Sequence, residues 1–201
     1  MPGPESLHAN GREADAEDVR LMRRVSKGES AAFEELIERH QALVSGTVAR
    51  MLGNNADVDD VAQQVFLRVW KNASRYVPRA RFTTWLLTIT RNLVFNELRR
   101  RRRHASVPLQ TETEGQELQT RDEQTASPDV SLLEGELQKA IESAIGALPE
   151  NQRLALILRR YEELSYEDIA DVLEQSVPAV KSLLFRARTE LRGRLKSYLA
   201  G

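Results

Sequence analysis

Apolar residues recur every three or four positions over two long stretches of the chain, from Glu17 to about Arg103 and from Leu132 to Leu199. This is the spacing of one face of an α-helix, and no useful stretch alternates polar and apolar residues as a strand does. Between the two lie residues 104–131, rich in Gln, Thr, Glu, Ser and Asp and poor in apolar side chains. Such a segment buries too little apolar surface to offset the entropy of ordering it.

The pattern therefore predicts an all-α protein with two small helical domains joined by a flexible acidic linker. Residues 1–16 are polar and are expected to form a disordered tail. The first domain should span residues 17–103, the linker 104–131 and the second domain 132–201.

Residues 57–70 form the clearest amphipathic helix, with apolar positions repeating through two full turns and beyond. Asp57 and Asp60 stand where a cap and a first-turn acid stabilise a helix N-terminus. The polar face includes Asp60, Gln63 and Gln64, whereas Trp70 falls on the apolar stripe and is predicted to lie in the core.

An aromatic and basic loop, residues 75–82, precedes a second helix that ends in five consecutive arginines, residues 99–103. One face of this helix combines aromatic, hydroxyl, amide and cationic side chains: Trp85, Thr88, Asn92, Asn96 and Arg99. Aromatic rings stack on unpaired bases, amides read base edges and cations hold the backbone. Trp85 is equally compatible with a core position and with a wedge against a duplex end. The arginines alone could be a nuclear-type signal or a general polyanion patch.

Residues 164–188 are typical of a helix-turn-helix. Ser165 and Asp168 form a capping box at the first helix, and Ser176 followed by Pro178 opens the second. The second helix buries one apolar stripe, while its other face has short side chains first and basic ones later, as a recognition helix requires. An ordinary helical hairpin with a solvated basic face is the plainer interpretation.

Charge is segregated although the net charge is only −1. Residues 68–103 hold eleven Arg or Lys against one acid, and residues 109–136 hold eight acids against one Arg. There is no cysteine, and the three histidines lack metal-ligand spacing. We find no phosphate loop, nucleophile elbow or acid pair, so we expect no enzyme, no catalytic residue, no metal site and no cofactor. No apolar run approaches the ~20 residues of a membrane span, which favours a cytoplasmic protein without membrane insertion.

Taken together, the motifs resemble those of an ECF (extracytoplasmic function) sigma factor of the sigma-70 family, a subunit of bacterial RNA polymerase. The resemblance covers roughly residues 18–103 and 133–199. It rests on residues 32–36, 57–70, 82–92 with 98–100, 148–153 and the helix-turn-helix.

The resemblance implies partners and site residues. The partners would be core RNA polymerase, through its β′ clamp coiled coil and β flap, promoter DNA and an anti-sigma factor. Core binding would use Asp60, Gln63, Gln64 and Phe66. Recognition and melting of the −10 element would use Tyr76, Arg79, Arg81, Phe82, Trp85, Thr88, Asn92, Asn96, Arg99 and Arg100. The −35 element would be read by Ser176, Pro178, Ala179, Lys181, Ser182, Phe185, Arg186 and Arg188.

Three positions depart from the family pattern. Gln64 stands where an acid is usual, and Asn96 where many members have Asp. Glu174 occupies a turn position that is often Gly, so it must adopt a left-handed conformation or a different turn.

Two other functions remain open. A self-sufficient helix-turn-helix regulator would explain the second domain but not the aromatic, amide and arginine face of the first. An RNA-binding or polymerase-tethering adaptor would need the charge but not the aromatic residues of the loop. Run-off transcription with purified core polymerase separates all three.

Overall fold

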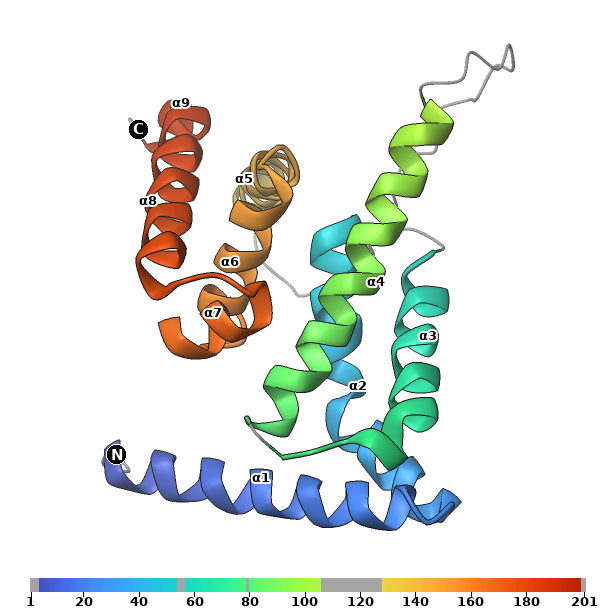
Figure 1. Cartoon of the computed structure of the whole chain (residues 1–201). Coiled ribbons are helices and arrows are strands. Elements are labelled where there is room, and N and C mark those ends of the chain that lie inside the picture. The colour runs from blue at the N-terminus through green and yellow to red at the C-terminus, as the bar shows by residue number, and fades with distance from the viewer. Residues whose placement is uncertain (1–3, 54–56, 79, 106–127, 200–201) are drawn as a thin grey trace.

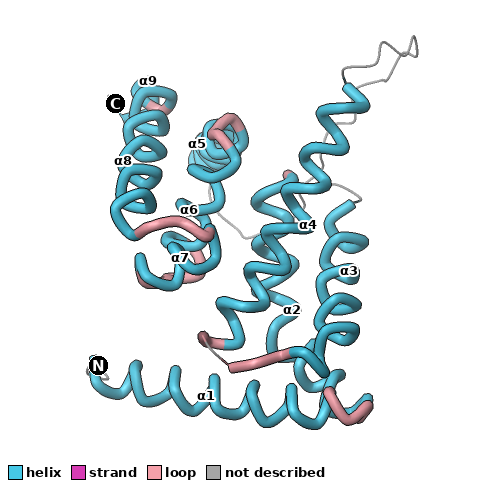
Figure 2. Tube along the Cα trace, in the orientation of Figure 1, coloured by secondary structure: helices cyan, strands magenta, loops and turns pink. Residues whose placement is uncertain are grey.

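The structure, a computed structural model, describes residues 4–53, 57–78, 80–105 and 128–199, and every regular element in these ranges is helical (Figures 1 and 2). The first domain contains α1 (Pro4–Val25), α2 (Ser30–Leu52), α3 (Asp57–Asn72), the 3₁₀ turn η1 (Ala73–Arg75) and α4 (Phe82–Ala105). The second contains α5 (Pro128–Gly146), α6 (Glu150–Arg160), α7 (Tyr166–Leu173), α8 (Val177–Arg194) and α9 (Lys196–Leu199). The all-α prediction is confirmed.

The expected linker falls mostly outside the described residues. At its two ends α4 continues to Ala105 and α5 begins at Pro128. The expectation of a disordered N-terminal tail needs correction for residues 4–16, because α1 begins at Pro4. Tertiary contacts account for part of this extension, since Arg39 Nη2 donates to the Ala14 carbonyl at 3.3 Å and Asp15 binds the start of α4.

The core of the first domain comes from one stripe on each helix. Leu21 and Met22 of α1 pack with Leu36 of α2, and all are almost fully buried. The predicted stripe of α3 is buried at Val61, Val65 and Val69. Trp70 corrects the prediction: it is 37% exposed and its ring lies against Phe33, with centroids 5.0 Å apart, at the edge of the core.

The helix-turn-helix has the predicted caps. The Ser165 hydroxyl oxygen accepts from Asp168 N at 3.0 Å and donates to the Asp168 carboxylate at 2.8 Å. Ser176 accepts from Ala179 N at 3.4 Å, with Pro178 in the first turn of α8. Glu174 ends α7 in the left-handed region, at φ 55° and ψ 44°. The sequence allowed this conformation for Glu174, and it turns the chain from α7 into α8.

The two domains pack against each other, which the sequence pattern did not predict. α4 lies against α7, and α2 lies against α6 and α5 (Figure 1). Arg153, from the second domain, donates to the Met51 carbonyl at the end of α2 at 2.7 Å and to Leu148 and Gly146 at the α5–α6 turn. Burial lowers the pKa of Arg153, against the opposing effect of Glu150.

Candidate nucleic-acid interface

An aromatic cluster joins the loop before α4 to the first turns of that helix. Phe82 is fully buried, and its ring lies 5.0 Å from His40, 5.8 Å from Trp85 and 6.0 Å from Tyr76 between centroids. Trp85 is half-buried and packs on Tyr76 at 4.9 Å. Phe82 therefore supports the loop from inside in this structure, and Trp85 is partly available to a ligand.

Tyr76 anchors the loop at its other end. Burial raises the pKa of its phenol to about 12, with a smaller contribution from Asp15 and Asp18. The hydroxyl stays neutral at ordinary pH and has no hydrogen-bond partner in the described residues. Of the other predicted loop residues, Arg81 is exposed and Arg79 lies outside the described residues. Val77, which the prediction omitted, is 59% exposed beside Tyr76 and is a candidate loop contact.

The amide face of α4 is where the sequence placed it. Asn92, Asn96 and Arg99 are exposed and Thr88 is half-buried, so the four line one side of the helix. Arg99 Nη2 donates to Asn96 Oδ1 at 3.0 Å, and Arg91 donates to Asn92 Oδ1 at 2.8 and 3.1 Å. Each amide therefore has its oxygen oriented by an arginine, which leaves the amide NH₂ as the group free to meet a base.

The five-arginine run makes structural hydrogen bonds in addition to supplying positive charge. Arg101 donates to the Leu52 carbonyl at 3.0 Å and to Asp57 at 2.8 Å, which ties the end of α2 to the start of α3. Glu97 accepts from Arg100 and Arg101, and these hydrogen bonds, that from Arg100 foremost, lower the pKa of its carboxyl. The run is therefore built into the domain and differs from a plain targeting signal.

Asp15 is a residue that sequence reasoning missed. Its Oδ1 accepts from the backbone N of Phe82, the first residue of α4, at 2.7 Å. A helix N-terminus has unpaired N–H groups and a partial positive charge, so a carboxylate there both caps and stabilises it. Asp15 thus fixes the junction of loop and α4 from a helix 67 residues away in the chain. No local motif marks it.

We expect Asp15→Ala to lower the free energy of unfolding by about 1 kcal/mol, since it leaves the α4 cap unmade. Asp15→Asn keeps an acceptor at the same position and should retain most of that stability. Chemical denaturation followed by circular dichroism measures both variants. An equal loss of stability in the two variants would show that the negative charge of Asp15 stabilises the N-terminus of α4 and that the hydrogen bond to Phe82 N does not.

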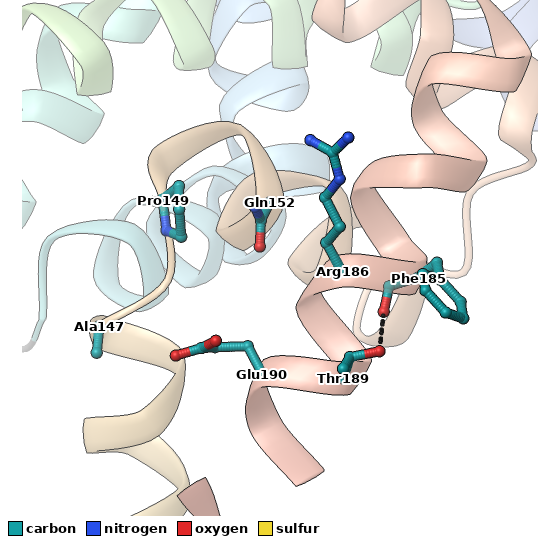
Figure 3. Close-up of a pocket in the computed structure, with 7 residues that line it drawn as sticks. All are labelled: Ala147, Pro149, Gln152, Phe185, Arg186, Thr189 and Glu190. Atoms are coloured by element: carbon teal, nitrogen blue, oxygen red, sulfur yellow. Dashed lines mark hydrogen bonds between the residues drawn. The ribbon is translucent and has the colours of Figure 1, made fainter. Parts of the chain in front are cut away.

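The predicted recognition face of α8 is open. Lys181, Ser182, Arg186 and Arg188 are exposed, and Phe185 is 69% exposed. Ser176 and Pro178 at the N-terminus of the helix are exposed too, and Ala179 is half-buried. A shallow hollow lies between α8 and the α5–α6 turn; Figure 3 shows Arg186 reaching over it beside Gln152, with Phe185 turned away. The face combines a short polar start with later cations, as sequence reasoning expected.

The polar face of α3 is a third exposed surface. Asp60, Gln63 and Gln64 are all exposed, whereas Phe66 is 9% exposed and belongs to the core. Leu67, which was not predicted, is 50% exposed one turn beyond Gln63. This α3 surface (Asp60, Gln63, Gln64 and Leu67) places one exposed apolar side chain among polar ones on a single helix face.

The described residues contain no group of three or more His, Asp or Glu side chains that could hold a metal ion. None of the described helices has both the length and the apolar character needed to cross a membrane. The arrangement is that of a two-domain helical DNA-reading protein: one helix with amides and arginines, and a separate helix-turn-helix.

Two family models match the chain, sigma-70 region 2 over residues 36–104 and sigma-70 region 4 over residues 138–191. The chain is 32% identical to the ECF RNA polymerase sigma-E factor of Haemophilus influenzae over 89% of its length and 95% of that protein. It is 33% identical to RNA polymerase sigma-H factor of Pseudomonas aeruginosa, over 91% and 96%. The chain therefore belongs to the ECF sigma factors, and as an RNA polymerase sigma factor it directs transcription initiation.

Two solved structures are similar in fold. One is CnrH in complex with the cytosolic domain of CnrY, with a TM-score of 0.64, 27% identity and coverage of 90% of this chain and 98% of that one. The other is the sigma factor RpoE in complex with the anti-sigma factor NepR from Bartonella quintana, with a TM-score of 0.63, 22% identity and coverage of 82% and 96%.

Proposed function

We propose that this sigma factor divides promoter-specific initiation among the three exposed surfaces described above. The α3 surface docks on the β′ clamp coiled coil of core RNA polymerase. The loop of Tyr76, Val77 and Arg81, which Phe82 supports from inside, acts with the amide face of α4 to recognise and melt the −10 element. The helix α8 reads the −35 element while its domain lies on the β flap. The main support for the proposal is the row of Asn92, Asn96 and Arg99 beside a half-exposed Trp85. An exposed ring next to amide and cationic groups suits the binding of unpaired bases, which a protein that binds only duplex DNA does not require.

Melting follows from the chemistry of the α4 face. Trp85 offers a flat ring on which an unstacked base can rest, and the amides of Asn92 and Asn96 can donate to base edges. Arg99 and the neighbouring cations neutralise the phosphates of the separated strand. Because stacking on the Trp85 ring is available only to a base that has left the duplex stack, binding here favours the open form of the duplex.

On α8, we expect Lys181 to contact a base and Arg186 to contact a phosphate. Lys181 lies one turn after the helix N-terminus, where recognition helices touch base edges, and Arg186 lies more than a turn later. We expect Lys181→Ala to cost about 1–3 kcal/mol and to relax preference at one base position. Arg186→Ala should weaken binding to all sequences alike, and it should reduce the slope of the logarithm of the binding constant against the logarithm of salt concentration by about one unit. Binding of variants to a set of −35 duplexes, in complex with core, measures this. If Arg186→Ala relaxed preference at one base position and Lys181→Ala weakened all sequences alike, the helix would be rotated in the groove relative to this assignment.

An anti-sigma factor is a further expected partner. Both similar structures hold a second protein, and one is described as an anti-sigma factor. We propose that a protein of this class binds the chain and competes with polymerase or promoter.

Run-off transcription with purified core polymerase tests the proposal. A sigma factor added to core should yield transcripts from defined promoters, and neither component should do so alone. A self-sufficient regulator would bind duplex DNA specifically without core and yield no transcript. An adaptor would bind core and support no promoter-specific start.

A further inference from the structure

The two asparagines on the exposed face of α4 differ in how their amide oxygens are bonded. Asn92 Oδ1 accepts two hydrogen bonds from one guanidinium, from Arg91 Nη2 at 2.8 Å and from Arg91 Nε at 3.1 Å. Asn96 Oδ1 accepts one, from Arg99 Nη2 at 3.0 Å. An amide oxygen has two lone pairs. The oxygen of Asn92 is therefore fully occupied, whereas the oxygen of Asn96 can accept one more hydrogen bond.

Arg91 holds its acceptor firmly. It is 8% exposed, its Nη1 donates to the Val172 carbonyl at 2.6 Å, and its Nη2 donates also to the Glu174 carboxylate at 2.8 Å. Arg99, by contrast, is exposed, and an exposed pair of side chains gains little from staying together. The two bonds to Asn92 run between neighbouring residues of α4, so they need no group from the second domain.

The orientation of the Asn92 amide follows from the chemistry of its partner. A guanidinium has N–H donors and no acceptor, so the amide oxygen, and not the NH₂ group, must face it. The side chain of Asn92 is exposed, and its Nδ2 makes no hydrogen bond within the described residues. Asn92 therefore presents the donors of its NH₂ group to a ligand and no acceptor.

This polarity separates the four bases by one exocyclic group. Guanine O6 and thymine O4 are acceptors, whereas the amino groups at adenine N6 and cytosine N4 are donors. The usual pair of asparagine with adenine uses the amide oxygen to accept from N6 and the amide NH₂ to donate to N7. Arg91 occupies that oxygen, so Asn92 cannot form this pair. Its NH₂ group would instead meet the amino group of adenine or cytosine as donor against donor.

We infer that Arg91 is a positioning residue that makes Asn92 selective for a keto base, guanine or thymine, at one position of the −10 element. Asn96 keeps a free lone pair, so it accepts amino bases as well as keto bases. This inference rests on the proposed function, because that function assigns −10 reading to α4. It adds the chemical class of base that one side chain selects and the residue that sets the selection.

A barcoded promoter library transcribed by the holoenzyme tests this selection. Templates randomised over the upstream region, each with a barcode in the transcribed sequence, are transcribed by core polymerase with the full chain, and sequencing of the run-off products gives the base preference at each position. Exchanging guanine for adenine, or thymine for cytosine, changes the exocyclic group at nearly constant size. At the one position where Asn92→Ala removes the preference, the wild type should favour keto over amino bases about two- to tenfold, the range for one hydrogen bond.

Two further variants change the polarity of the Asn92 side chain. Arg91→Ala frees the amide oxygen, so adenine should be accepted and the ratio of keto to amino bases should fall towards one. Asn92→Asp presents oxygens that accept and do not donate, so the ratio should reverse in favour of adenine and cytosine. Because Asn92 is exposed, Asn92→Asp keeps the core intact and decides the question even if Arg91→Ala fails to fold.

Arg103→Ala is the matched control. It removes an exposed arginine from the same helix, one that has no hydrogen bond to Asn92 in the described structure. It should lower transcription from all templates alike and leave the base ratio at the wild-type value. A purely structural role of Arg91 would also lower transcription without changing that ratio, so the ratio separates positioning from folding.

The selection by Asn92 is overturned if no position favours keto bases, if Asn92→Asp keeps the wild-type ratio, or if a folded Arg91→Ala protein gives the same ratio as Arg103→Ala. Promoter-specific run-off with ratios that these variants leave unchanged would overturn the inference and leave the proposed function standing. Absence of promoter-specific run-off by the wild type would overturn the proposed function, and the −10 role of Asn92 with it.

Discussion

Phe82→Ala is expected to lower the free energy of unfolding by about 3–5 kcal/mol, the usual cost of emptying a buried aromatic site. Phe82 is fully buried at the first residue of α4, between His40, Tyr76 and Trp85. Because single domains are only about 5–15 kcal/mol stable, this loss should remove much of the stability of the first domain. Urea denaturation followed by circular dichroism measures the change.

Phe185→Ala is the matched control, since this ring is 69% exposed on α8. It should change stability by no more than about 0.5 kcal/mol. Its effect, if Phe185 meets DNA, should be on −35 binding in complex with core. A Phe82→Ala protein as stable as Phe185→Ala would mean that the ring is not the centre of the cluster and that the loop is held in another way.

Replacing Asp60, Gln63 and Gln64 together by alanine is expected to weaken binding to core polymerase by about 2 kcal/mol or more, roughly thirty-fold. All three are exposed on α3 and lie outside its buried stripe, so the packing of the helix should be retained. Fluorescence anisotropy with labelled protein and purified core measures the affinity. Adding Leu67→Ala should weaken binding further if the exposed leucine is the apolar centre of the α3 surface.

A triple replacement of Glu34, Glu38 and Gln41 by alanine on α2 is the control. These residues are exposed at helical spacing on a different helix of the same domain. Their loss should leave core affinity near the wild-type value. Undiminished affinity in the α3 variant, or an equal loss in the α2 control, would remove α3 as the main docking surface.

The features that were predicted from sequence depend on contacts within one or two helical turns. Ser165 and Asp168 are three residues apart, and so are Ser176 and Ala179; a cap formed over so short a distance can be read from residue types alone. The same holds for the stripe of α3 and for the line of Asn92, Asn96 and Arg99, because a helix fixes which residues share a face. The family motifs are of this local kind.

Long-range contacts account for what was missed. Trp70 has the spacing of a core residue, but it lies near the end of α3, where its ring packs on Phe33 at the edge of the core and stays 37% exposed. Arg101 belongs to a run that suggests a patch of charge, and only the fold brings it to Leu52 and Asp57, 49 and 44 residues away. Asp15 carries no local signal at all, because the N–H that it caps belongs to another helix.

By itself, the sequence determined that the protein is helical, where α3 and the two helices of the helix-turn-helix start, and which faces carry the groups proposed to read DNA. Each of these depends on residues close together in the chain. The tertiary structure alone decided which side of α4 the second domain covers. Arg91 and Glu174 are 83 residues apart, and their contact depends on how two separate domains meet. The spacing of apolar residues along a helix gives no information about this domain interface, because the packing of two domains depends on the shape and charge of their folded surfaces.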